Sequence, residues 1–300
     1  MIATRIGFLF EHPTWTQPVR EALHQRGVAV EAIDVGAIQW RVDQAPPAVD
    51  WWINRVNSMP SIGRPASVVA STGHILAWLE LHGQRVVNGS AVHRIGSSKA
   101  AQGALFARIG MDTPASVAVG HPTDVHAAME TLGCPVLVKP NVGGSGVGIR
   151  RFDEPSQLDD AAALDPIDLG ADGTGIVQRV IESADGLVHR IEMLGHEVLY
   201  ATAQPLATDG FNYCAVDGTA AVGGSALRLT EPADAVVHQA AACMAAAEAD
   251  VGSIEYIVDA DTGRPNFFDF NPYSNFITGY DDELGFDPIE RYLDFVLASS

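Results

Sequence analysis

The sequence has few cysteines and few cationic side chains. Its three cysteines, Cys134, Cys214 and Cys243, lie far apart, so neither their number nor their spacing fits a disulfide framework or a metal-binding motif. Lysine and arginine together number 18 against 37 aspartate and glutamate residues, which gives a formal net charge of -19. A surface of that sign repels nucleic acid and anionic membranes. An anionic ligand would therefore need a local cationic pocket.

The sequence also lacks a long apolar run. The segment from Met1 to Phe10 is interrupted by Arg5 and is too short for a signal peptide, and no later stretch reaches the roughly 18 residues that a membrane helix needs. We therefore expect a cytoplasmic protein in a reducing compartment, with no membrane partner and no nucleic-acid partner. With 300 residues, 47% of them hydrophobic, the chain can bury the cores of two or three subdomains.

The first 95 residues alternate short apolar strands with helices, which indicates an α/β fold with an open parallel sheet. Strands are expected at 5–10, 28–34, 49–54 and 85–87, and helices at 16–25 and 65–81. Ligands of such Rossmann-like sheets meet the carboxyl ends of the strands. The candidate substrate contacts are therefore the residues that follow predicted strands, namely Glu11, His12, Asn54 and Arg55.

The rest of the chain predicts two further α+β subdomains. The central one, residues 96–175, is expected to begin with a helix at 98–109 and to contain two strands that flank a glycine-rich loop. The C-terminal one, residues 176–300, alternates strands with an alanine-rich helix and ends in a helix begun by Asp287 and Pro288. The predicted domains are thus 1–95, 96–175 and 176–300.

The most informative stretch places Lys139 at the end of an apolar strand, just before four glycines within residues 143–148. Glycine adopts positive φ and lets backbone N–H groups approach a ligand closely, so such a loop can fold over phosphates. No Gly-Lys-Ser/Thr follows, which excludes a P-loop, and a strand rather than a helix comes next, which disfavours a Rossmann fingerprint. The pattern indicates a lid over a nucleotide, and a flexible hairpin with a surface lysine is the alternative. The lid residues expected to contact the nucleotide are Gly143, Gly144, Ser145 and Gly146.

A predicted β-hairpin, residues 253–272, carries the candidate metal ligands. If its tip is Thr262, Glu255 lies directly opposite Asp269, and the two-residue period of a strand puts Asn271 on the same face. Two facing carboxylates repel each other unless a hard cation lies between them, and Mg2+ prefers oxygen ligands. The apolar neighbours of these residues favour a buried metal site over the alternative, a solvated strand face.

The stretch that follows the central subdomain runs from an apolar strand through a turn into another strand. The side chain of Gln178 and the backbone of Val180 are candidate contacts for an adenine edge, and Glu182 or Asp185 for ribose hydroxyls. Arg190 has the geometry to hold a phosphate or a carboxylate with two hydrogen bonds. Each of these residues, taken singly, fits a turn or a surface charge equally well.

Taken in chain order, these motifs resemble the ATP-grasp superfamily, and within it the carboxylate-amine ligases related to glutathione synthetase and to the ribosomal-protein glutamate ligases. The resemblance spans the whole chain. Its matching pieces are Ser98-Lys99, Gly110 to Pro114, Val138-Lys139-Pro140 with the glycine loop, Val177-Gln178 to Arg190, and Asp269 to Pro272. It implies an ATP-grasp fold, the use of ATP with Mg2+ or Mn2+, and a small-molecule carboxylate and an amine as substrates. It also suggests a homodimer.

The resemblance implies a role for each of several residues. Those implied to contact ATP are Lys99, Lys139, Gln178, Arg179, Val180 and Ile181, beside the candidate ribose contact Asp185. Those implied to bind the metal are Glu255, Asp269 and Asn271. Those implied to act in catalysis are Lys139, Arg190 and Arg228, and Asn212 corresponds to a position near the metal or phosphate.

Departures from the family pattern leave other functions open. Val188 stands where these ligases carry an acidic residue, so contacts made there are not carried over. The segment 271–280 resembles the end of ATP-grasp inositol phosphate kinases, which transfer phosphate to a hydroxyl group. A small-molecule kinase and a nucleotide-binding protein without catalysis therefore stand beside the main expectation, an ATP-dependent ligase that forms an amide bond through an acyl phosphate. Its specificity is expected to lie with His12, Arg55 and the region 204–228.

Overall fold

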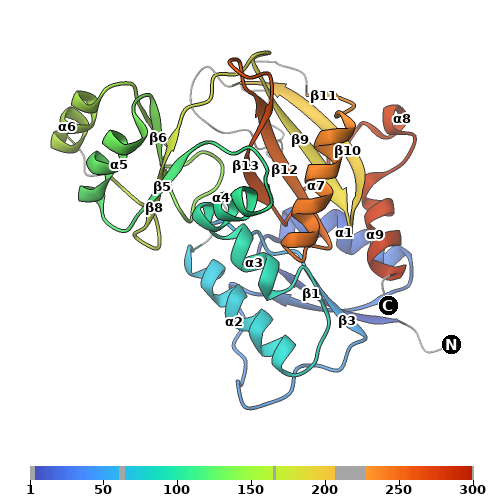
Figure 1. The fold of residues 1–300 in the computed structure, drawn as a ribbon. Coiled ribbons are helices and arrows are strands. Elements are labelled where there is room, and N and C mark those ends of the chain that lie inside the picture. Colours follow the sequence, from blue (N-terminus) through green and yellow to red (C-terminus); the bar gives the residue numbers. More distant parts are fainter. Residues whose placement is uncertain (1–3, 61–64, 165–166, 207–226, 299–300) are drawn as a thin grey trace.

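The computed structural model describes residues 4–60, 65–164, 167–206 and 227–298, which form three sheets (Figure 1). The N-terminal sheet has the strand order β2-β1-β3-β4, and all of its strands are parallel. Its elements are β1 (Arg5–Phe10), α1 (Pro13–Gln25), β2 (Ala29–Asp34), β3 (Trp51–Asn54), α2 (Ser67–Leu81) and β4 (Val86–Val87). The open parallel sheet expected from alternating strands and helices is confirmed.

The middle sheet lies apart in a lobe of its own, drawn in green in Figure 1. Its strands are antiparallel in the order β5-β8-β6-β7, and a separate apolar core fills the space beneath its helices. Its elements are β5 (Ser116–Val119), the 3-10 turn η1 (Pro122–Asp124), α5 (Val125–Leu132), β6 (Val136–Pro140), β7 (Arg150–Phe152), α6 (Pro155–Leu164) and β8 (Gly175–Arg179). The glycine-rich loop connects β6 to β7, as the sequence predicted.

The C-terminal sheet is antiparallel, with the order β11-β10-β9-β12-β13 among the described strands. Its elements are β9 (Leu187–Leu194), β10 (Glu197–Pro205), β11 (Arg228–Leu229), α7 (Asp234–Ala246), β12 (Val251–Val258), β13 (Pro265–Asn271), α8 (Asp281–Leu284) and α9 (Pro288–Ala298). One face of this sheet packs on α7 through Cys243 and Met244, which lie in the same core as Phe267 and Phe270.

Two helices join the sheets, α3 (Ser90–Gly96) and α4 (Lys99–Arg108). Phe106 of α4 lies in the core of the C-terminal sheet and packs against the Phe267 ring, with ring centroids 6.4 Å apart. The N-terminal sheet shares a second core with α9, in which Phe8 and Tyr292 are both buried. The N- and C-terminal sheets therefore share a buried apolar core, whereas the middle sheet has one of its own.

Some boundaries differ from those expected. Helix α1 begins three residues earlier than predicted, because the His12 side chain caps it by accepting a hydrogen bond from the Trp15 N–H over 3.3 Å. Strand β8 pairs with β5 and β6, although the predicted range 176–300 grouped its residues with the C-terminal part. No described helix is both long and apolar enough to cross a membrane.

Candidate active site

A cavity of about 330 Å³ is lined by residues of the middle and C-terminal sheets and by helix and loop residues, some of them from the N-terminal part. Its volume lies at the lower end of the range for small-molecule sites, roughly 300–1,000 Å³. Trp15 and Met59 come from the N-terminal part, Lys139 from the middle sheet, and Arg190 and Asp269 from the C-terminal sheet. The predicted ATP and metal residues lie along this one cavity, with the exceptions given below.

The predicted metal hairpin is confirmed in its register. Glu255 on β12 pairs directly with Asp269 on β13, and Ser253 pairs with Asn271. A β-bulge follows Glu255 and shifts the register by one residue toward the turn, so the simple pairing rule holds only at the cavity end. The Asn271 amide donates a hydrogen bond to Asp269 over 3.0 Å, which brings the three predicted oxygen-bearing side chains onto one face.

Burial and neighbouring charges together set the protonation of the two carboxylates. Burial raises the pKa of Glu255 to about 7, although Arg190 acts in the opposite direction. Burial also acts to raise the pKa of Asp269, but Lys99 and the hydrogen bond from Asn271 hold that pKa below its ordinary value. Asp269 is therefore an anion at neutral pH, and Glu255 becomes one readily when a cation approaches.

Two carboxylates and one amide suit a hard cation that takes its remaining ligands from phosphate and water. The described residues contain no group of three or more His, Cys, Asp and Glu side chains placed to hold a metal ion. The chemistry of Glu255, Asp269 and Asn271 thus fits Mg2+ or Mn2+ bound together with a nucleotide, and does not fit an all-protein metal cage.

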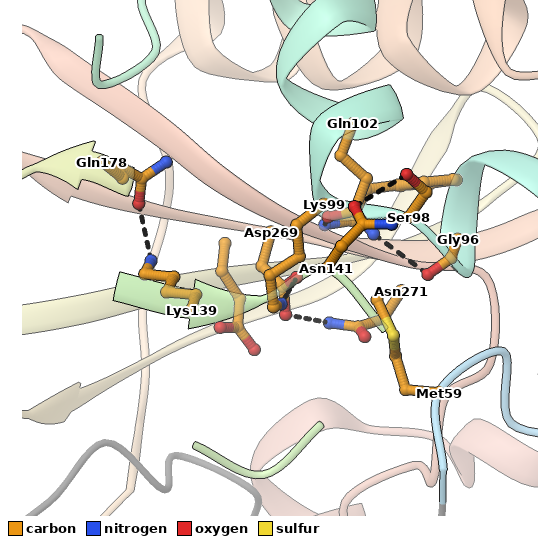
Figure 2. A network of polar contacts seen from close by, with 12 residues as sticks. Met59, Gly96, Ser98, Lys99, Gln102, Lys139, Asn141, Gln178, Asp269 and Asn271 are labelled. Carbon is orange, nitrogen blue, oxygen red and sulfur yellow. Dashed lines mark hydrogen bonds and ion pairs between the residues drawn. The ribbon is translucent and has the colours of Figure 1, made fainter. Parts of the chain in front are cut away.

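Lys99 and Lys139 are the only two lysines in the sequence, and both line the cavity. The Lys99 ammonium lies 3.2 Å from an Asp269 oxygen, and the Lys139 ammonium donates to the Gln178 side-chain oxygen over 2.6 Å (Figure 2). Lys139 is only 6% exposed, and burial together with the Lys99 charge lowers its pKa to about 7. A buried ammonium that donates to a neutral amide is a place for an anion.

Asn141, which sequence reasoning missed, joins the two lysine-bearing elements. Its side-chain oxygen accepts hydrogen bonds from the Ser98 hydroxyl (2.9 Å) and the Ala100 N–H (3.0 Å), and its carbonyl accepts from the Lys99 N–H (3.1 Å). Figure 2 shows Asn141 next to Ser98 at the start of α4. The end of β6 is therefore fastened to the beginning of α4, which keeps Lys99 and Lys139 on one cavity.

The glycine loop forms one wall of the cavity. Its members that line the cavity are Gly143, Gly144, Ser145, Gly146 and Val147. Gly148 has φ +76°, and a Cβ there would lie 2.8 Å from the Pro140 ring. At Gly144 a Cβ would lie 3.2 Å from the Met59 Cβ, so the loop backbone comes close to the N-terminal part. Packing against Pro140 on one flank and Met59 on the other therefore favours glycine at both positions.

Arg190 on β9 lies between two buried carboxylates. Its guanidinium donates to Glu192 over 2.6 Å and to Glu255 over 2.9 Å. Burial alone would lower the pKa of Arg190, but these two carboxylates raise it, so the side chain stays charged. Glu192 was not predicted, and the signal that would have found it is the two-residue strand period that puts it on the same face as Arg190.

The predicted adenine segment lines the cavity from Gln178 to Ile181. The Gln178 side chain is already used, because it accepts from Lys139 and donates to the Ser116 hydroxyl over 3.0 Å. The Val180 N–H donates to the Pro135 carbonyl over 3.1 Å, so this N–H is also used within the fold. Adenine would therefore be met here chiefly by apolar surface and by other backbone groups.

Several predicted residues do not line the cavity. Asp185 accepts hydrogen bonds from Ser183 and His189 within its own turn, and Arg228 lies exposed on the edge strand β11. His12 caps α1 and stacks on Trp15, whose ring does line the cavity, with the centroids 4.2 Å apart. Asn212 lies outside the described residues, as does most of the region 204–228.

Arg55 holds the N-terminal sheet to the C-terminal loop. It is buried, its guanidinium carbon lies 4.5 Å from the centroid of the Tyr273 ring and 5.3 Å from that of Phe276, and it donates to the Ser274 carbonyl. The neighbouring Asn54 donates to the Asn88 carbonyl over 3.0 Å. Arg55 and Asn54 therefore serve the packing of the fold, and neither lines the cavity.

Comparison with curated proteins finds short matches to ligases. The chain is 37% identical over 102 residues to D-alanine–D-alanine ligase from Kocuria rhizophila, a match that covers 30% of this chain and 27% of that protein. It is 39% identical over 77 residues to D-alanine–D-alanine ligase B from Xanthomonas campestris, covering 25% and 23%. The matched stretches thus span about a quarter of these relatives, and no protein-family model matches the chain.

Solved structures match over nearly the whole length. The VanG D-Ala:D-Ser ligase from Enterococcus faecalis superimposes with a TM-score of 0.71 at 15% identity, covering 99% of both chains. The RimK-domain ATP-grasp protein from Sphaerobacter thermophilus gives 0.70 at 15% identity, covering 97% of this chain and 99% of that one. The ATP-grasp ligase PsnB, in a structure that contains Mg and ADP, gives 0.66 at 17% identity, covering 99% of both. The chain therefore has the ATP-grasp fold, as its motifs predicted.

Proposed function

We propose that this chain is an ATP-dependent carboxylate-amine ligase, which forms an amide or peptide bond through an acyl phosphate and releases ADP and phosphate. The observation that carries the proposal is the placement of both lysines and the facing carboxylates Glu255 and Asp269 around one cavity, beneath the glycine loop. This arrangement supplies cations for phosphate oxygens and anions for a divalent metal within the same small volume.

Charge supports ATP as the phosphate donor. A strongly acidic chain places its only two lysines on this cavity, where Lys139 is buried and donates to an uncharged amide. An anion bound there would compensate the buried ammonium and raise its pKa again. The apolar stretch from Val180 to Ile181 beside the loop offers surface for a purine ring.

Glu255, Asp269 and Asn271 would hold Mg2+ or Mn2+, which when bound neutralises phosphate charge and orients the terminal phosphoryl group. Lys99 contacts Asp269, so a phosphate oxygen that reaches the metal also comes within reach of this ammonium. Arg190 donates to Glu255 and thereby keeps a guanidinium beside the metal residues. We propose that the substrate carboxylate binds next to the Arg190 guanidinium.

In the first step the substrate carboxylate oxygen bonds to the terminal phosphorus of ATP while the bond to the bridging oxygen breaks, giving an acyl phosphate and ADP. In the second step the amine nitrogen bonds to the acyl carbon, the bond from that carbon to the phosphate oxygen breaks, and phosphate leaves with the bonding electrons and takes up the proton that the amine loses. Neither step needs a protein nucleophile. The glycine loop, whose residues Gly143 to Val147 line the cavity, excludes water from the labile intermediate.

The similar proteins support a ligase. Two D-alanine–D-alanine ligases and the VanG D-Ala:D-Ser ligase are named for joining small amino acids, and PsnB was solved with Mg and ADP. The phosphotransferase alternative has no support among these relatives. We further propose small-molecule substrates, a cytoplasmic location, no nucleic-acid or membrane partner, and a homodimer as the assembly.

The proposal is tested by trapping the acyl group. The protein is incubated with ATP, Mg2+ or Mn2+, pooled amino acids and small carboxylates, and hydroxylamine, and ADP, phosphate and hydroxamate are followed together. We expect hydroxamate and ADP in equal amounts. A phosphorylated acceptor without hydroxamate, or ATP binding without any turnover, would contradict a ligase.

A further inference from the structure

Glu192 presents an oxygen with no partner to the cavity. The residue is only 2% exposed and lies on the cavity wall. One oxygen, Oε1, accepts from the Arg190 Nε–H over 2.6 Å, whereas Oε2 has no hydrogen-bond partner within the described parts of the chain. Buried carboxylate oxygens are seldom left in this state, because each loses its hydration without compensation. Oε2 of Glu192 can therefore accept a hydrogen bond from a donor group of a bound ligand.

A second acceptor that lacks a donor in the described part of the chain lines the same cavity. In the strand register Glu192 pairs with Tyr200 of β10, and the Tyr200 hydroxyl accepts from the Ile277 N–H over 3.1 Å. The loop that contains Ile277 also carries Asn275, which lines the cavity. The side-chain oxygen of Asn275 also lacks a partner among the described residues. Two acceptors without donors among the described residues thus line the same cavity.

A metal ion does not fit these acceptors. Glu192, Glu255 and Asp269 do not form a three-residue metal group in the described structure, and the Arg190 guanidinium lies between Glu192 and Glu255. Arg190 already takes Oε1, so Glu192 offers a single free oxygen, whereas a divalent cation needs about six oxygen ligands. A protonated amine carries a single charge and three N–H donors, and one of these donors satisfies the free oxygen of Glu192.

We infer that Glu192 binds the protonated amine of the substrate whose carboxylate is activated, so that this substrate is an amino acid. The inference rests on the proposed ligase function. Arg190 and Glu192 lie two residues apart on one strand face, about 7 Å along the backbone, so one small molecule can contact both side chains. The substrate carboxylate then lies on the Arg190 side, next to the metal residues, and its ammonium lies on the Glu192 side.

The test compares amino acids with matched acids that lack the amine. Hydroxamate formation is measured with ATP and Mg2+ for D- and L-alanine against propionate, for D- and L-serine against 3-hydroxypropionate, and for glutamate against glutarate. We expect the wild-type kcat/KM to favour each amino acid that is turned over by at least about 100-fold over its partner, because a desolvated carboxylate is left unpaired by the acid without an amine. In Glu192→Gln we expect that ratio to fall below about tenfold.

The control is Glu197→Gln, which removes the same charge from the exposed beginning of β10 and should keep the wild-type ratio. If Glu192 only positions Arg190, Glu192→Gln will slow amino acids and plain acids equally and leave the ratio unchanged, which would overturn the inference. Equal wild-type activity toward alanine and propionate would overturn it without any variant, should Glu192→Gln fail to fold. Hydroxamate from plain acids alone refutes only the role of Glu192, whereas no hydroxamate from any acid refutes the ligase function itself.

Discussion

The Lys99 ammonium lies 3.2 Å from a carboxylate oxygen of Asp269, although the two residues are 170 positions apart in the chain. This pair connects the first turn of α4 to the hairpin that carries the predicted metal ligands. The same carboxylate therefore faces a protein cation and belongs to the proposed metal site. Under that proposal, a nucleotide phosphate bound to the metal would also accept a hydrogen bond from Lys99.

Replacing Asp269 with asparagine should stop turnover without unfolding the protein. The change keeps the shape of the side chain and removes the charge that a divalent cation needs, so we expect ATP turnover to fall by at least about 100-fold. The melting temperature should fall only moderately, because no core volume is lost although Lys99 loses its charged partner. ADP release and thermal unfolding are measured side by side. Asp261→Asn, in the exposed turn of the same hairpin, is the control, and full activity in Asp269→Asn would remove the metal assignment.

Lysine labelling should report nucleotide binding directly. Lys99 and Lys139 are the only lysines, so reductive methylation followed by intact-mass measurement can modify only these two side chains and the N-terminal amine. We expect ATP with Mg2+ to protect both side chains and to leave the N-terminal amine reactive, which serves as an internal control. In Lys139→Met one protectable site should disappear. Equal labelling with and without ATP would show that neither lysine contacts the phosphates.

A methyl group at the base of the glycine loop should weaken nucleotide binding. Gly148→Ala would place a Cβ 2.8 Å from the Pro140 ring, whereas Gly173→Ala, which also has positive φ, would meet nothing within 4 Å. Both variants carry the backbone cost of an alanine at positive φ, on the order of 1 kcal/mol, so they should lose similar stability from that source. Only Gly148→Ala should displace the loop and lower ATP affinity, measured by calorimetry. Equal affinities would separate the loop from nucleotide binding.

Acid should destabilise the protein through His93. Burial lowers the pKa of His93 below its ordinary 6.5, against the effect of the hydrogen bond between its Nε2 and the Val69 carbonyl. Because the folded state holds the neutral ring, the stabilising contribution is complete above about pH 6.5 and is lost as the pH falls, when the unfolded state takes up the proton first. Melting temperatures from pH 8 to pH 5 should fall more steeply for the wild type than for His93→Gln. Parallel curves would contradict this account.

Local patterns predicted the elements well where they are strongly periodic. Strand β1 was expected at 5–10 and spans Arg5–Phe10, and the hairpin register at Glu255 and Asp269 follows from alternation alone. The helix α3 at Ser90–Gly96 was not predicted, because its seven residues carry no clear apolar period and its fold depends on packing against α2 and α4. The bulge after Glu255 was missed for a similar reason, since no residue type there demands it.

The scarcity of lysine is a further signal in the sequence. Two lysines among 300 residues, each next to a motif, point to ligand contacts rather than to surface charge. By contrast, Arg55 follows a strand as a ligand contact would, yet its guanidinium stacks on Tyr273 and Phe276. The position of Arg55 after a strand cannot distinguish a ligand contact from a packing role, because its aromatic partners lie more than 200 residues away in the chain.

The class of fold, the glycine loop after Lys139 and the facing pair of Glu255 and Asp269 follow from local sequence, because each depends on spacing within a few residues or across one turn. Three other relationships depend on how the chain packs: Lys99 meets Asp269, Asn141 fastens β6 to α4, and Glu192 keeps a buried oxygen without a partner in the described part of the chain. These relationships join segments that come together only when separate sheets and helices pack, and that packing is set by the sum of many long-range contacts rather than by any local pattern.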